Sequence, residues 1–405
     1  MDLTSLTILT SFVFIIIFLT LILAFTKSNE KITYWAVLII VLFLILILSW
    51  WTIDMALQWV LVEATTLIGA ILISMSKNEK SIEVAWKFLL LNSFGLALAF
   101  LGLIILSFGI HSQISTNAYE MLAQIKTHQN ALVETGIWLM IFGYSAKLGL
   151  FPNHFWVSDT YSESPSQISA MISALFPPTV CFALRPVVKM DYEFNTEHFS
   201  SAHALLALGI LTLLYCIWTI YQTFDLRRIT AQVALFHSGG LAILLFLNPS
   251  DKVFYFALAA NITVKSLLFS TMGVLRIDSG TRNLNELKSD SGINKTSAWM
   301  YFIAMGMASI IPISPFFISD MLFLKVGFTA GKLWVICIPI LSIIFFLIVF
   351  QKISPILTIP SRKFLPDVEK VLRIRLIFSF LLFLISLALG IYGIYHFDKG
   401  DFFNV

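Results

Sequence analysis

Charged residues are scarce in this sequence. Only 12% of its 405 residues are Asp, Glu, Lys or Arg, whereas a soluble domain carries about 25%. Hydrophobic residues make up 58%, and the mean hydropathy is +0.89. This composition excludes a water-exposed globule, so we expect most of the chain to lie in lipid. The net charge of +3 is too small to indicate a nucleic acid as partner.

Motifs of soluble enzymes are also absent. The sequence contains no dinucleotide-binding or phosphate-binding glycine loop, no HExxH and no nucleophile elbow. Its three cysteines, Cys181, Cys216 and Cys337, lie far apart in apolar runs, without the spacing of metal ligands or disulfides. We therefore expect no cofactor, no metal and no catalytic residue in this chain. Any redox chemistry would have to come from a partner.

What the sequence does contain is long apolar runs. A membrane-spanning helix needs about 17–25 such residues, and unpaired backbone in lipid is too costly for open strands. We therefore predict an all-α polytopic membrane protein with about twelve transmembrane helices, the first of them retained because no cleavage site follows it. The runs cover residues 5–26, 33–51, 55–76, 83–110, 133–151, 167–188, 203–223, 229–247, 253–275, 297–325, 333–351 and 376–396.

The distribution of Lys and Arg predicts the orientation. The connections after the odd-numbered runs carry sixteen of these residues, and the opposite connections carry five. Basic connections favour the cytoplasmic side, so we expect an inner (cytoplasmic) membrane protein with both termini outside. An odd number of helices would scramble this segregation, which is a second reason to expect twelve.

Two of the runs are interrupted. Pro152 and a polar stretch break the run within residues 145–165, and Pro312 and Pro315 break another within residues 307–320. Ordinary proline kinks would be the simpler interpretation. Broken helices at matching positions of two halves are, however, typical of inverted-repeat transporters whose ion path lies at the breaks.

This pattern predicts two inverted five-helix repeats, each with a broken fourth helix. The predicted parts are an N-terminal helix and loop (1–32), a first half-channel unit (33–190), a second half-channel unit (203–352), and a cytoplasmic linker with a C-terminal helix (353–405).

Lys265 is the most informative single residue. It lies about eleven residues from either end of its run, or ~16 Å along a helix. A lysine can reach the interface only from near a helix end, so Lys265 should face a hydrated interior or a carboxylate. A lysine in such a place can take up and release protons.

Other ionisable residues also fall in or beside the runs. Glu63 lies eight residues into its run, and Lys147 lies just before the first break, where it could also extend to the cytoplasmic interface. His237 lies near the middle of an apolar run. A lone buried histidine is usually a packed core residue, but it can also relay protons.

The remaining candidates lie at the breaks. Asp320 follows the second break, with Lys325 five residues later, and either could simply mark a helix end. His154, Asp159 and Glu163 lie in the polar part of the first break, where we expect solvated or capping loop residues. Glu163 would open the next helix, because an acidic residue suits a helix N-terminus.

Five stretches of the sequence resemble the proton-channel, antiporter-like subunits of the complex I, Mrp antiporter and group 4 membrane hydrogenase superfamily. The likeness is closest to the hydrogenase-4 component F type and covers about residues 33–350. The stretches are WVLVEATTLIGAILI, GYSAKLGLFPNHFWVSDTYSESPSQISAMIS, DLRRITAQVALFHSGG, VKSLLFSTMGVLRIDSGTRNLNEL and SPFFISDM.

The resemblance implies a proton path. Glu63 and Lys147 would form the carboxylate–lysine pair of the first half, Lys265 would be the central lysine, and Asp320 the acid of the second broken helix, with His237 bridging along a hydrated axis. His154 and Lys325 are secondary candidates. Proton binding at Lys147 would be biased by the charge of Glu63, since opposite charges ~5 Å apart interact by about 3 kcal/mol at an effective dielectric near 20.

The sequence departs from the family at several positions. Members typically have about fourteen helices, so the resemblance implies that two are missing before residue 33. The sixth run has Pro177 and Pro178 and lacks the central lysine or histidine of many members. Ala257 and Asn261 stand where close relatives have histidines. The connection between the half-channels should therefore be unusual.

Three functions remain open from the sequence. The first is a proton-conducting subunit that works with other membrane subunits and a soluble cytoplasmic redox module containing iron–sulfur or nickel centres. The second is the membrane subunit of a two-component, proton-motive-force-driven inorganic carbon uptake system with a zinc-containing, carbon dioxide-hydrating partner. The third is a scaffold that conducts nothing.

Overall fold

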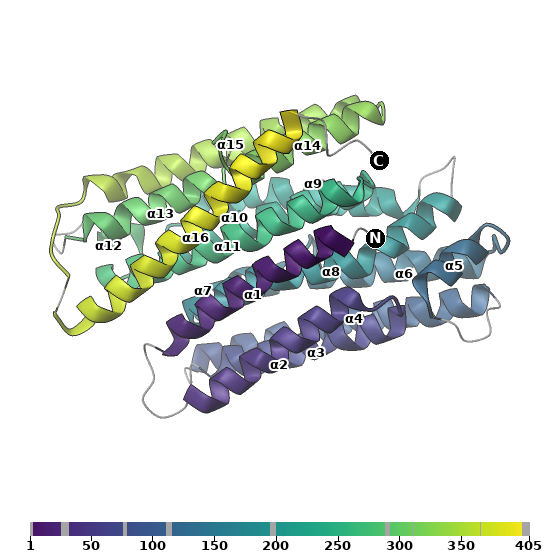
Figure 1. Ribbon diagram of the computed structural model, residues 1–405, viewed down its shortest axis with the longest axis horizontal. Coiled ribbons are helices and arrows are strands. Elements are labelled where there is room, and N and C mark those ends of the chain that lie inside the picture. The colour runs from purple at the N-terminus through teal and green to yellow at the C-terminus, as the bar shows by residue number, and fades with distance from the viewer. Residues whose placement is uncertain are drawn as a thin grey trace.

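The computed structural model describes residues 3–25, 32–75, 79–110, 116–194, 200–287, 292–309, 311–364 and 366–398. Within these ranges the chain forms sixteen α-helices, two 3₁₀ helices and no strand (Figure 1). The first half contains α1 (Leu3–Phe25), α2 (Ile32–Trp51), α3 (Met55–Ser74), α4 (Glu79–Gly109), α5 (Ala118–Ile125), α6 (Ala131–Leu148), α7 (Phe155–Glu163) and α8 (Ser166–Phe194). The second contains α9 (Ser201–Gln222), α10 (Leu226–Phe246), α11 (Asp251–Ser279), α12 (Leu284–Leu287), α13 (Lys295–Met307), α14 (Pro315–Thr329), η1 (Leu333–Ile336), α15 (Cys337–Ile353), η2 (Ser354–Thr358) and α16 (Pro366–Asp398).

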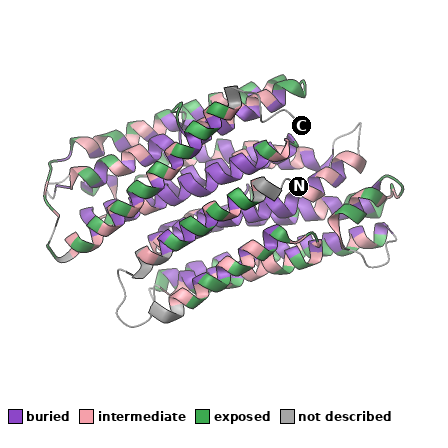
Figure 2. Ribbon diagram, in the orientation of Figure 1, coloured by how far each residue is buried: buried purple, intermediate pink, exposed green. Residues whose placement is uncertain are grey.

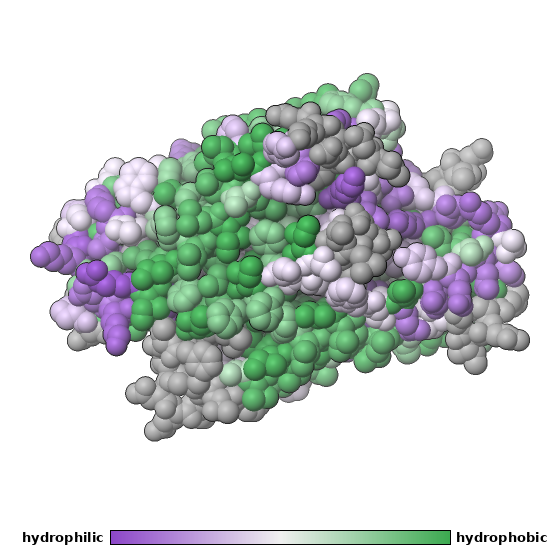
Figure 3. All heavy atoms as spheres, in the orientation of Figure 1, coloured by the Kyte–Doolittle hydropathy of each residue, from purple (hydrophilic) through white to green (hydrophobic). Residues whose placement is uncertain are grey.

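The predicted all-α membrane fold is confirmed. Each of the twelve apolar runs corresponds to a helix or to a broken pair of helices. By length and composition, eight spans in the described ranges could cross a membrane, and two shorter apolar helices lie at Thr7–Thr20 and Trp35–Trp51. Figure 3 shows the resulting apolar band between two hydrophilic ends.

Three helices lie at the centre of the bundle. In α8, α10 and α11, respectively 89%, 94% and 94% of the most apolar stretch is buried, against 33% in α9 (Figure 2). A helix that is buried on all sides cannot turn polar side chains toward water. The buried ionisable residues of these helices, such as His237 of α10 and Lys265 of α11, therefore face protein neighbours.

Glycines bring α4 and α6 into close contact. Gly95 and Gly102 of α4 face Gly143 and Gly136 of α6, two pairs separated by seven residues on each helix. A Cβ on Gly143 would lie 2.5 Å from the backbone nitrogen of Ala99, so no larger residue fits. Small residues at a helix interface allow this approach in membranes, and it fixes α6, which carries Lys147, against α4.

Both predicted breaks are present. Helix α6 ends at Leu148, where Gly149 adopts a left-handed conformation with φ of 80° that terminates the helix. The chain then forms the nine-residue helix α7, where the sequence predicts a loop. In the second half, α13 ends at Met307, and α14 begins at Pro315 with its N-cap Ser314 accepting from the backbone nitrogen of Phe317.

Connections between helices gather at the two ends of the bundle. Isolated backbone bridges join Asp225 to Asn283 and Ile293 to Ser361. The connection between α9 and α10, the one between α11 and α13, and the one between α15 and α16 therefore meet at one end of the bundle, and they carry many of the basic residues. Helix α1 begins, and α16 ends, toward the opposite end (Figure 1). This agrees with an even number of crossings, while the side of the membrane and the inverted relation of the two units stay predictions. Of the basic residues used for orientation, these lie outside the described residues: Lys27, Lys31, Lys77, Lys288 and Lys399.

Candidate functional site

Lys147 is buried in the first half of the bundle. Its exposed fraction is 1%, so it does not extend to the interface, the alternative that the sequence left open. The Nζ atom donates to Oγ1 of Thr66 on α3 at 2.6 Å and lies 5.2 Å and 4.9 Å from the ring centres of Phe88 and Phe176. Because Lys147 occupies the last turn of α6, the negative end of the helix dipole also stabilises its charge.

Glu63 is joined to Lys147 through Thr66. Ser93 of α4 donates to Oε1 of Glu63 at 2.6 Å, and the hydroxyl of Thr66 makes a longer contact of 3.5 Å to Oε2. A hydroxyl can accept from an ammonium and donate to a carboxylate at the same time. The structure thus brings the predicted pair together with one hydroxyl between its members, and the pair makes no direct ion pair among the described residues.

Lys265 is fully buried in the second half, with an exposed fraction of 0%. Its Nζ donates to Oγ of Ser238 on α10 at 3.1 Å, and the thiol of Cys181 on α8 is close enough to interact with it electrostatically. It has no carboxylate in ion-pair contact within the described ranges. An unpaired buried charge is expensive, so its charge state depends strongly on its few polar neighbours.

Several buried polar atoms without protein partners lie on α10 and α11, the helices that carry Ser238 and Lys265. Asn261, one turn earlier on α11, is fully buried, and neither its amide nitrogen nor its amide oxygen has a partner. The hydroxyl of the adjacent Ser266 and the amide oxygen of Gln232 on α10 are also unpaired. Buried polar groups are normally satisfied, by ordered water where protein groups are missing. The unpaired atoms of Asn261 and Ser266, on the helix that carries Lys265, therefore lack the protein partners that such groups normally have.

His237 caps the second broken helix. Its Nε2 lies 2.8 Å from the carbonyl oxygen of Ala308, which can only accept, so Nε2 carries the proton. The ring stacks on Phe316 with centroids 3.5 Å apart. Unwinding of α13 frees backbone carbonyls that must be satisfied inside a membrane, which gives His237 a structural task.

Asp320 lies beside His237. Both line a cavity of about 20 Å³ between α10 and α14, together with Ser319 and Ser342. A cavity needs roughly 10–15 Å³ to admit one water molecule, so a single water would fit between these side chains. The structure thus brings together Asp320 and His237 at the second break. Lys325 lies on the same helix, half-buried, and does not line this cavity.

The burial of His154 contradicts the prediction that it is a solvated loop residue. Its exposed fraction is 2%, and neither ring nitrogen has a hydrogen-bond partner. The ring packs against Phe151, with centroids 5.5 Å apart, and against Tyr215 of α9 at 3.8 Å. The aromatic neighbour from α9 buries His154, and a local reading of the sequence could not foresee it.

The central helix α8 runs between the two lysines. Phe176 contacts Lys147, and α8 also packs on α11, the helix that carries Lys265. Pro177 and Pro178 lie within the helix and remove the backbone donors for the carbonyls of Ser173 and Ala174. The carbonyls of Ser173 and Ala174 thus lack the backbone N–H that would bond to them in an uninterrupted helix.

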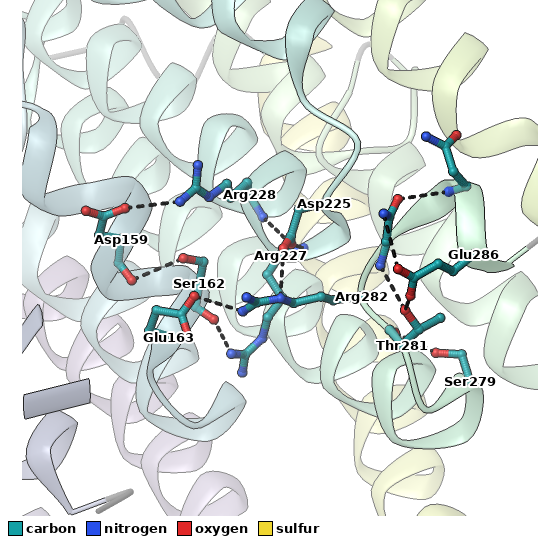
Figure 4. A network of polar contacts seen from close by, with 12 residues as sticks. Asp159, Ser162, Glu163, Asp225, Arg227, Arg228, Ser279, Thr281, Arg282 and Glu286 are labelled. Atoms are coloured by element: carbon teal, nitrogen blue, oxygen red, sulfur yellow. Dashed lines mark hydrogen bonds and ion pairs between the residues drawn. The ribbon is translucent and has the colours of Figure 1, made fainter. Parts of the chain in front are cut away.

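A polar network holds α7 against the second half (Figure 4). The buried Arg227 of α10 donates to the carbonyl oxygens of Ser162 and Ser164, which end α7. Arg282 pairs with Glu163 at 2.8 Å and with Asp225 at 3.2 Å. Glu163 is therefore the last residue of α7 and an ion-pair partner, and not the start of the next helix as predicted, because the arginine holds it across the units.

Asp159 has a similar role. It lies on α7 and pairs with the exposed Arg228 at 3.5 Å (Figure 4). The role of these arginines was not predicted from the sequence, and neither were Thr66, Ser93 and Ser238 as partners of the buried charges. The available signals were the i, i+3 spacing of Glu63 and Thr66 and the position of Ser238 directly after His237.

Buried lysines, a half-buried acid and two broken helices inside a bundle of apolar spans define a polytopic membrane protein with ionisable residues in its interior. A family model described as NADH:quinone oxidoreductase/Mrp antiporter, TM, matches residues 52–346. The chain belongs to this family and is an antiporter-like membrane subunit, as its sequence motifs predicted.

Curated relatives have several activities. A hydrogenase-4 component F homolog from Methylacidiphilum infernorum is 24% identical over 298 residues, covering 71% of this chain and 62% of the relative. One subunit of a Na⁺/H⁺ antiporter from Alkalihalophilus pseudofirmus is 27% identical over 274 residues, covering 64% of this chain and 52% of the relative. The chain thus spans between half and two thirds of the length of these relatives.

Solved structures share the fold. One chain of the archaeal membrane-bound sulfane sulfur reductase superposes with a TM-score of 0.77 at 19% identity, covering 92% of this chain and 75% of that one. A chain of respiratory complex I from Thermus thermophilus gives a TM-score of 0.72 at 17% identity, covering 94% and 83%.

Proposed function

We propose that this chain conducts protons across the membrane as one subunit of a larger, redox-driven complex. The observation that supports the proposal is that its two buried lysines have similar surroundings. Lys147 and Lys265 are each at most 1% exposed, each donates to one hydroxyl, and neither contacts a carboxylate among the described residues. A permanent structural charge would normally be paired.

In the first half, Glu63 controls the proton on Lys147. The carboxylate, the Thr66 hydroxyl and the ammonium form a short chain in which the hydroxyl can pass a proton or reorient. When Glu63 is charged it favours the ammonium form of Lys147, and when Glu63 is neutral this support is lost. A change of charge at one end of the chain thus loads or unloads the lysine.

In the second half, the path continues from Lys265 to Asp320. Ser238 contacts Lys265, and the next residue back, His237, shares a water-sized cavity with Asp320. Between the halves, the carbonyls freed by Pro177 and Pro178 on α8 would hold water in place of the missing side chain. Fixed cations oppose Na⁺, so we propose protons as the ion.

The partners follow from what this chain lacks. No residue pattern in its sequence supplies a redox ligand, so the driving energy would come from other membrane subunits and a soluble cytoplasmic catalytic module. Purification of the native complex tests this. Iron–sulfur or nickel-containing partners support the proposal, whereas a zinc-bound, carbon dioxide-hydrating partner indicates the inorganic carbon uptake system.

Conduction is tested in liposomes that contain the purified complex and a pH-sensitive dye. We expect proton flux in the wild type and a loss of most of it in Lys265→Ala and in Glu63→Gln. If both variants assemble and conduct like the wild type, the assigned path is wrong and the chain acts as a scaffold.

A further inference from the structure

A second polar feature lies at the end of the bundle where α8 ends and α11 begins. A cavity of about 210 Å³ opens there and is lined by aromatic and basic side chains, among them Trp50, Tyr255, Arg185 and Lys189, and by the carboxylate of Asp251. This end is opposite to the network of Figure 4, and none of these residues belongs to the path described above.

Arg185 and Asp251 form an ion pair in the lining of this cavity. The guanidinium is 12% exposed, pairs with Asp251 and donates to the carbonyl oxygen of Pro249 at 3.3 Å. It also lies 4.0 Å from the ring centre of Phe254. Its Nη1 is buried without a protein partner, so one donor of a charged group remains unsatisfied at this point.

The two helices that carry the ion pair, α8 and α11, extend from the cavity into the interior, and α11 also carries Lys265. On α8, Cys181 precedes Arg185 by four residues, about 6 Å along the helix and on the same face, and α8 packs on α11, which carries Lys265. On α11, the unpartnered Asn261 lies one turn from Lys265 toward the cavity. The ring of Phe182, next to Cys181 on α8, lines the cavity and packs on Trp50 and Tyr255 with centroids 5.3 Å and 6.0 Å apart.

We propose that this cavity is the aqueous mouth of the path to Lys265, and that the Arg185–Asp251 pair and the Phe182 ring form its barrier. The role of the mouth rests on the proposed proton conduction. The neutralising carboxylate matters because an unpaired arginine in a narrow passage excludes cations, as in other selective pores. Phe182 and Arg185 lie about one turn apart on α8, so we expect the ring and the ion pair to move together on opening.

Cys181 is a native reporter behind the barrier. In a Cys216→Ala/Cys337→Ala background it is the only thiol of this chain. Its reaction with a membrane-impermeant, cationic methanethiosulfonate is followed in proteoliposomes containing the whole complex, and the label on this chain is read after its separation from the other subunits. We expect slow labelling in this background. Arg185→Gln and Phe182→Ala should each raise the rate about tenfold, as for a closed–open equilibrium shifted by one order of magnitude. The increase should occur only with reagent on the cavity side.

Glu193→Gln is the matched control. It lies two turns further along α8 and removes the exposed Lys126–Glu193 pair at the same end, outside the cavity. Its labelling rate should equal that of the background. Unchanged labelling in both folded barrier variants, or equal labelling from the opposite side, would overturn the proposal. Because labelling does not depend on proton flux, failure of the mouth is distinguishable from failure of conduction.

Discussion

The ammonium of Lys147 donates to the hydroxyl of Thr66 across 2.6 Å, and that hydroxyl also approaches Glu63. Thr66 therefore stands between the two charges whose coupling the proposed mechanism requires. In the second half, the ammonium of Lys265 donates to the hydroxyl of Ser238. In both halves, a hydroxyl thus links the buried lysine to the other residues of the proposed path.

Removal of the bridging hydroxyl should uncouple Glu63 from Lys147. We expect Thr66→Val to lower proton flux about tenfold, equivalent to roughly 1.4 kcal/mol of barrier, while Thr66→Ser keeps most of it. The measurement is dye-detected flux in liposomes. Thr65→Val is the matched control, because the Thr65 hydroxyl donates to the carbonyl of Val62 within its own helix. Equal flux in Thr66→Val and Thr65→Val would show that the bridge is not used.

His237 has a structural and a proposed functional role that one substitution can separate. The amide nitrogen of Gln can replace Nε2 as the donor to Ala308, but a glutamine does not relay protons near neutral pH. His237→Gln should therefore keep the melting temperature of the complex and lower the flux, whereas His237→Ala should lower both. Normal flux in His237→Gln would restrict this histidine to capping the broken helix.

The arginine network should contribute strongly to the position of α7. Arg227→Met removes two charge-assisted hydrogen bonds to the carbonyls of Ser162 and Ser164 and should destabilise the protein by roughly 2–4 kcal/mol. The neighbouring Arg228 is 52% exposed and makes only a 3.5 Å pair, so Arg228→Met should cost under about 1 kcal/mol. Thermal unfolding of the two variants in detergent checks the difference. Similar melting temperatures would contradict the assigned role of Arg227.

Close packing of α4 on α6 predicts that Gly143 tolerates no side chain. Gly143→Ala should destabilise the protein by about 1–3 kcal/mol, because its Cβ would meet the backbone of Gly95 and Ala99 at 2.5 Å. In Gly240→Ala, the new Cβ would meet only Phe323, at 3.8 Å. Thermal unfolding should therefore separate the two variants, and a Gly143→Ala protein as stable as the wild type would show that the helices can move apart.

Hydropathy and charge were sufficient to predict the membrane fold and the burial of Lys265, because lipid imposes length and polarity on every span. The breaks were readable from Pro152, Pro312 and Pro315. The helical form of α7 was not predicted, because its polar residues are typical of a loop. Arg227 and Arg282, which contact the end of this helix, are distant from it in the sequence.

The partners of the charges were equally hidden. Thr66 and Ser238 are ordinary hydroxyl residues of apolar helices, and such residues most often bond to their own backbone. Only packing shows that they contact Lys147 and Lys265. The burial of His154 depends in the same way on Tyr215, a residue of another helix.

The central claim is that one proton path passes through both buried lysines in series. It is tested most directly by the flux through complexes carrying Lys147→Met, Lys265→Met or both, in liposomes under the same pH gradient. The account predicts that each single substitution removes most of the flux and that the double variant is no slower than the slower single one, because the steps share one path. Wild-type flux in an assembled single variant would contradict this claim. It would also be contradicted if the flux lost in the double variant equalled the sum of the losses in the two single variants, as expected for two independent routes.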